Sequence, residues 1–244
     1  MKKYFFVVTL CVFILNINAQ MKQGTILYER KMDVHRRMKD EQMKAMVPQF
    51  RTTQHELFFN EKESVYKTLE DEDAAPDPFD NGSGGRVVIK INGPGDNSVM
   101  YKNFATHVFL EQTALDDNEY VIEDSIHNLQ WKLSDETKTI LNHVCKKATA
   151  KTEHGSDVIA WYADDILVPA APETFDGLPG AVLMLDINDA EMVYTATSIK
   201  EDVDSKQLKT PTEGKHITRA DFKKKMEELF GPPSADGKTI INVN

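Results

Sequence analysis

Short strand-like runs separated by turn residues recur along most of this chain and limit it to a β-rich fold. The first run, residues 24–31, is rich in β-branched and aromatic side chains, and residues 51–59 and 64–69 flank a polar turn as in a hairpin. Further runs of this kind cover residues 86–91, 99–104, 106–111, 119–122, 129–133, 138–141, 143–150, 158–162, 180–187, 192–200 and, at the end, 239–243. This spacing predicts a mainly β or α+β domain with an antiparallel sheet.

Two segments have helical periodicity instead. Residues 33–47 begin with an aspartate that can cap a helix and end before Pro48, which stops one. Near the end of the chain, Thr218 and Asp221 resemble a capping box, and the helix that they start runs to Phe230. Three apolar residues of this second helix share one stripe: Phe222, Met226 and Leu229. We therefore expect one helix in the N-terminal region and one at the C-terminus, both packed on the sheet.

The first nineteen residues have the pattern of a secretory signal. Two lysines precede an apolar run over residues 4–15, and a small residue, Ala19, lies at the expected cleavage site. The run is too short for a stable membrane span, and no later stretch is apolar enough to be one. We predict a signal peptide over residues 1–19, a single domain over residues 20–244, and a location in the periplasm, on the outer membrane or outside the cell.

Charge and cysteine content narrow the classes of function. The formal net charge of −10 and the scattered lysines exclude a basic nucleic-acid footprint. Cys145 alone remains after signal removal, so no internal disulfide can form; a buried, inert thiol is the favoured reading and a mixed disulfide the alternative. Residues 70–85 are acidic and then rich in glycine, which predicts a flexible surface loop.

One motif carries a family resemblance. Residues 175–183, FDGLPGAVL, resemble the motif that names the GLPGLI family of exported Bacteroidetes proteins, with Ala181 and Val182 in place of its final Leu and Ile. Segments that fit the same family in the same order are residues 24–30, 119–124, 131–140, 143–148 and 160–162. The resemblance implies an exported β-rich domain whose biochemical role is undefined, and it brings no catalytic residues.

A second likeness is one of architecture. Such sequences are similar to half-barrel lipoprotein carriers, in which a curved sheet wraps around helices and encloses an apolar ligand. This likeness implies that the antiparallel sheet is curved and half-barrel-like. By itself, fold does not determine function. The first hypothesis is therefore a non-enzymatic binding or carrier module for a hydrophobic or peptide-like partner. The candidate ligand-binding residues are Trp161, Tyr162, Phe175, Leu178 and Pro179. For residues 177–180, a purely structural corner of the chain is the favoured interpretation.

Two further hypotheses belong to other classes. His35, Met38, Met43 and Met46 offer imidazole and thioether groups, which suit Cu(I), so a metal-handling protein is the alternative. A methionine-rich apolar face that packs on the sheet explains the same residues more simply. The third hypothesis is a structural partner of an outer-membrane protein complex. No nucleophile motif or phosphate loop appears, so neither catalytic residues nor a cofactor are predicted.

Overall fold

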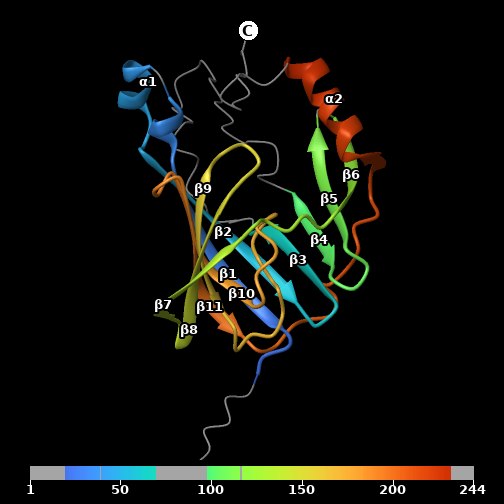
Figure 1. The fold of residues 1–244 in the computed structure, drawn as a ribbon. Helices are drawn as coiled ribbons and strands as arrows, with labels where there is room; N and C mark the ends of the chain where they lie inside the picture. The colour runs from blue at the N-terminus through green and yellow to red at the C-terminus, as the bar shows by residue number, and fades with distance from the viewer. Residues whose placement is uncertain (1–19, 39, 70–97, 116, 232–244) are drawn as a thin grey trace, which may run out of the picture.

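A single twelve-stranded sheet dominates the computed structural model, which describes residues 20–38, 40–69, 98–115 and 117–231 (Figure 1). Its strands are β1 Gly24–Asp33, β2 Phe50–Phe59, β3 Glu63–Thr68, β4 Val99–Asn103, β5 Val108–Leu115, β6 Asn118–Ser125, β7 Lys132–Ile140, β8 His143–Lys151, β9 Asp157–Ala163, β10 Ala181–Ile187, β11 Met192–Lys200 and β12 Lys215–Thr218. They lie in the order β12-β6-β5-β4-β3-β2-β1-β11-β10-β9-β8-β7. Every pairing is antiparallel except β12 with β6. The predicted curved antiparallel sheet is confirmed.

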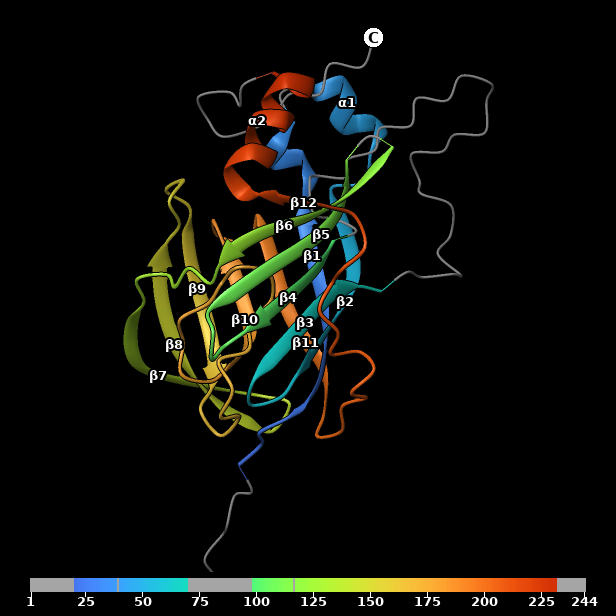
Figure 2. The same ribbon diagram turned by 90° about the vertical axis from the view of Figure 1, so that its right-hand side faces the viewer.

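The sheet is open and strongly curved, so its two arms face each other across an inner face (Figures 1 and 2). β7, β8 and β9 form one arm, and β3 to β6 form the other. The helices α1 Glu41–Met46 and α2 Arg219–Phe230 both lie at one end of this curved sheet (Figure 2). Of the helices that the structure describes, none has the length and apolar character needed to cross a membrane.

The segment between β9 and β10, residues 164–180, lies between the two arms and covers the inner face; we call it the covering segment. It contributes buried apolar residues to the same core as the central strands. From the segment these are Ile166, Val168, Ala170, Ala171, Phe175 and Leu178, and from the strands they include Ile26, Tyr28, Leu57, Phe59, Tyr66 and Tyr194. The inner face of the described sheet is thus largely occupied by the protein's own side chains.

The motif at the end of the covering segment has a structural explanation. Gly177 has φ of +108°, a conformation that side chains disfavour. Gly180 is needed for space, because a Cβ there would lie 2.1 Å from the carbonyl oxygen of Ala163. β10, which follows, is a central strand in which Ala181, Val182 and Leu183 are all buried. The predicted corner followed by a strand covered on both faces agrees with these observations.

The N-terminal helical segment differs from its prediction. Residues 33–47 form the 3-10 helix η1, Val34–Arg37, and the short helix α1 instead of one continuous helix. η1 ends at Met38, whose backbone is extended with φ of −99° and ψ of 135°. His35 Nε2 donates to the carbonyl of Val47 at 2.9 Å and the Val34 N–H donates to the carbonyl of Gln49, so η1 is bonded to the chain that follows α1. Met46 is 74% exposed, so its side chain does not pack on the sheet as the methionine-face interpretation expected.

The C-terminal helix begins as predicted. The Thr218 hydroxyl accepts a hydrogen bond from the Asp221 N–H at 3.2 Å, which satisfies one of the free donors of the first turn. Phe222 packs edge-on against Tyr120, in a small core separate from the main one. Leu229 is about half exposed, so the predicted stripe is only partly covered. The preceding β12 was not predicted, because four residues carry too little strand signal and pair only through the fold.

Other predictions differ in their bounds or cannot be compared. The predicted runs 129–133 and 138–141 are one strand, β7, with an irregularity in its pairing to β8. The predicted signal peptide over residues 1–19, the loop over 70–85 and the runs 86–91 and 239–243 lie outside the described residues.

Candidate functional site

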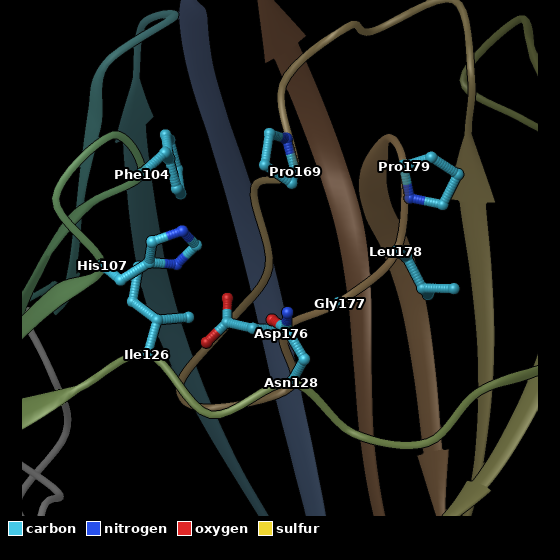
Figure 3. Close-up of a pocket in the computed structure, with 9 residues that line it drawn as sticks. All are labelled: Phe104, His107, Ile126, Asn128, Pro169, Asp176, Gly177, Leu178 and Pro179. Carbon is cyan, nitrogen blue, oxygen red and sulfur yellow. The ribbon is translucent and has the colours of Figure 1, made fainter.

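A small pocket of about 240 Å³ opens at the rim of the sheet, where three separate stretches of chain meet (Figure 3). One wall comes from the β4–β5 turn, one from the β6–β7 connection and one from the covering segment. The lining residues are Phe104, His107, Ile126, Asn128, Pro169, Asp176, Gly177, Leu178 and Pro179. Most of this lining is apolar, with the His107 ring, the Asn128 amide and the Asp176 carboxylate as the polar groups.

Backbone hydrogen bonds fix these walls to one another. The Ile126 N–H donates to the carbonyl of His107 at 2.9 Å, which joins the first two walls. The carbonyl of Asp176 accepts from the Leu129 N–H at 3.1 Å and from Trp131 Nε1 at 2.9 Å, which joins the second wall to the covering segment. A pocket whose walls are bonded in this way is preformed, as binding sites usually are.

A buried ion pair lies at the floor of the pocket. Lys102 Nζ on β4 contacts Asp176 Oδ1 at 2.7 Å, and the two side chains are 1% and 4% exposed. Lys102 also donates to the carbonyl of Ala171 at 3.3 Å. Burial raises the pKa of Asp176, and the charge and hydrogen bond of Lys102 offset this only in part. The pair therefore anchors the covering segment to the opposite arm and places a carboxylate against the pocket.

A second carboxylate on the inner face, that of Glu173, is partly buried. Glu173 accepts a hydrogen bond from the Tyr194 hydroxyl at 2.5 Å and one from Arg30 at 3.4 Å. His55 stacks on Tyr66 with ring centroids 5.2 Å apart. Burial, and then the negative charge of Glu173, raise the pKa of Tyr194. Glu173 is thus a second carboxylate that holds the covering segment, here against β1 and β11.

The predicted ligand-binding residues fall in different places. Leu178 and Pro179 line the pocket. Phe175 and Tyr162 are buried in the main core, Phe175 with its ring 6.3 Å from that of Tyr194. Trp161 is only partly buried, and Lys138 lies over its ring at 5.2 Å. The structure therefore brings two of the five together at the pocket and uses two others as core.

Sequence reasoning missed most of the pocket lining. Phe104 lies at the end of one predicted strand, His107 lies within the next predicted run, 106–111, and Ile126 follows the run 119–122. Nothing in the sequence marks the three as neighbours. Asp176 lies inside the motif of residues 175–183, but no pattern in the sequence marks its carboxylate as functional. A lysine in the middle of a strand-like run, Lys102, was the one available signal, because lysine is almost never fully buried without a partner.

Of the residues in the metal hypothesis, His35 has its Nε2 bonded to the backbone carbonyl of Val47. His35 lies in η1, Met38 just after it, and Met43 and Met46 lie in α1. Among the described residues, no group of three or more His, Cys, Asp or Glu side chains is placed to hold a metal ion. Copper binding by these thioethers stays a prediction.

Cys145 is fully buried on β8. Burial raises the pKa of its thiol to about 11, and the negative charge of Asp165 adds to the effect. A protonated thiol without access to solvent is unreactive, which supports the buried-thiol interpretation over a mixed disulfide.

The fold and the pocket define this chain as a mostly β domain with an open, curved sheet, a covering segment and a small rim pocket. The chain belongs to the family described as "N-glycanase peptide, N-terminal domain", whose family model matches residues 90–224.

The structures of PNGF-II in space groups C2 and P21 are similar to the chain in fold. Both are 16% identical in sequence, with TM-scores of 0.57 and 0.58 over 86% of this chain. The chain spans about a third of the PNGF-II chain, 33% and 34% in the two structures. No curated protein matches the sequence.

Proposed function

We propose that this chain is a non-enzymatic binding module that anchors an apolar group of a peptide-like partner in the rim pocket. The observation that carries the proposal is a preformed pocket with apolar walls and a few convergent polar groups, which is the usual composition of a binding site. Its volume, about 240 Å³, lies below the ~300–1,000 Å³ of pockets for drug-sized ligands. One side chain of a partner suits this volume better than a whole lipid does.

The covering segment is the reason to favour an anchor over an enclosed cargo. A carrier of the half-barrel kind needs an empty apolar hollow, and here the covering segment packs its own side chains against the inner face. Cargo could enter that space only by displacing the segment together with its two carboxylate anchors, the buried Asp176 and the partly buried Glu173. A partner that binds at the rim displaces neither of them.

Family membership favours a second candidate, in which the chain serves as a recognition module that acts alongside an N-glycanase. The chain spans about a third of PNGF-II, so it corresponds to only one part of that protein. In this case the partner held in the pocket would belong to the substrate or to the enzyme. Export and the likeness to the GLPGLI family fit both candidates and remain proposals, as does the outer-membrane partner.

The test is selection of binders from a library of random peptides, followed by affinity measurement on matched variants of the full chain. Phe104→Ala removes an apolar wall and should weaken the selected peptides roughly tenfold or more, as for a buried anchor contact. Val144→Ala, on the exposed surface of β8, is the control and should leave the affinity unchanged.

If Phe104→Ala proves unstable, His107→Asn is the second variant. His107 is exposed and has φ of +57°, a conformation that asparagine also tolerates, so the fold should persist while the ring is lost from the pocket. Selected peptides that bind both pocket variants as tightly as the parent chain would show that the pocket is not the binding site.

A further inference from the structure

We infer that the rim pocket takes an aromatic side chain with a neutral hydrogen-bond donor at its tip, with the phenol of tyrosine as the best fit. This inference rests on the proposed binding function and names the chemical group that the pocket recognises. Asp176 carries it, because its carboxylate is almost completely buried yet lines the pocket. In Figure 3 the carboxylate points into the space bounded by His107, Ile126 and Pro169.

One oxygen of this carboxylate is engaged and the other is available. Lys102 binds Oδ1, and the backbone oxygen of Asp176 takes both of the bonds from Leu129 and Trp131. Among the described residues, Lys102 binds this carboxylate through Oδ1, and Oδ2 is not one of the enclosed polar atoms that lack a partner, so Oδ2 is open to the pocket. An acceptor that is open to a pocket favours a ligand that donates to it, because a ligand that covers it without donating would leave it without a partner once water is excluded.

The walls determine which ligand body fits. The apolar part of the lining comes from Phe104, Ile126, Pro169, Leu178 and Pro179 (Figure 3). Tyrosine combines a large apolar ring with a hydroxyl that finds a partner when it is buried. An aliphatic hydroxyl or a primary amide would supply the donor but would leave most of this apolar surface without a contact.

The charge at the floor selects a neutral donor over a cationic one. Lys102 and Asp176 form an ion pair with no net charge, and the ammonium of Lys102 lies 2.7 Å from the carboxylate. A lysine or arginine of the partner would approach that ammonium and would also lose its own hydration. The other titratable group of the lining, His107, adds no negative charge that could compensate.

The experiment compares three probes of similar size on the full chain: the N-acetyl amides of tyrosine, phenylalanine and lysine. Two-dimensional ¹⁵N-¹H spectra report which amides move and give the three affinities. We expect shifts at His107, Gly177 and Leu178, with the tyrosine amide binding roughly ten- to hundredfold more tightly than the phenylalanine amide. The lysine amide should bind more weakly than either aromatic probe.

The outcomes separate the inference from the proposal beneath it. Equal affinity of the tyrosine and phenylalanine amides, with shifts at the pocket, would overturn the donor inference and leave the binding function standing. Tightest binding by the lysine amide would overturn the neutral-donor argument in the same way. If neither aromatic probe shifted a pocket amide, the donor inference and the proposed binding function would both fail. Phe104→Ala is the companion variant, because it should weaken both aromatic probes while the ratio between them stays the same.

Discussion

The Lys102–Asp176 pair provides the sharpest test of how the covering segment is held. Lys102→Met removes the cation and keeps the length of the side chain, so that Asp176 stays buried without its partner. Removal of one member of a buried pair costs about 3–5 kcal/mol of unfolding free energy. For a domain of this size, about 2–4 °C of melting temperature corresponds to each kcal/mol, so the melting point should fall by roughly 6–20 °C.

The unfolding free energy that Lys102→Met loses should depend on pH, and the structure determines the direction. Burial raises the pKa of Asp176 in the folded state, and without Lys102 nothing offsets that effect. A carboxyl whose folded pKa exceeds its unfolded value of about 3.9 destabilises the fold above the folded pKa. As the pH falls below that folded pKa, the carboxyl takes up a proton and the penalty is relieved by at most about 1.4 kcal/mol per pH unit. The variant should therefore lose less stability at pH 5 than at pH 8.

Urea unfolding of the parent chain and of Lys102→Met at pH 5 and pH 8 measures the loss of unfolding free energy. Lys146→Met is the matched control, because Lys146 and Asp164 form a surface pair whose side chains are each 45% exposed, and stability should barely change. A cost for Lys102→Met below about 1 kcal/mol at pH 8 would refute the reasoning, because that is the size expected of an exposed pair. An equal cost at both pH values would refute the argument that Asp176 stays buried and ionised.

Two further predictions concern other parts of the molecule. Because burial raises the pKa of Cys145 to about 11, an alkylating reagent at pH 8 should leave this thiol unmodified in the folded chain and modify it fully in urea. Peptide mass spectrometry would locate the modified residue, and rapid modification in the folded state would contradict the buried-thiol interpretation. Burial alone would raise the pKa of Asp124, but hydrogen bonds from Ser125, His127 and Arg219 outweigh it and hold the pKa below its ordinary value. The contribution of Asp124 to the stability of the fold is therefore present above about pH 4 and is lost as the pH falls further. Arg219→Ala, which also removes the 2.8 Å contact with Glu111, should speed amide hydrogen exchange in α2 and β12 while β1 and β2 keep their protection; unchanged exchange in α2 would show that apolar packing around Phe222 alone holds the helix.

The sequence determined the elements whose causes are local. Alternation of apolar and polar residues fixed most of the strands, since side chains of a strand point to opposite faces in turn. A capping hydroxyl three residues before a carboxylate fixed the start of α2 at Thr218, and the Gly177–Gly180 turn fixed the corner before β10. The antiparallel sheet followed from the number and spacing of these runs, whereas its curvature was expected only from the likeness to half-barrel carriers.

The tertiary structure decided what depends on contacts between distant residues. Nothing local distinguishes Lys102 from an exposed strand lysine, and its partner Asp176 lies 74 residues further along the chain. In the sequence, the covering segment looks like an ordinary connection between strands. Only the curvature of the sheet brings it against the inner face. The rim pocket, likewise, exists only because three walls from separate parts of the sequence are bonded together. Burial and hydrogen bonds between these parts stabilise the arrangement, and no single stretch of sequence contains them.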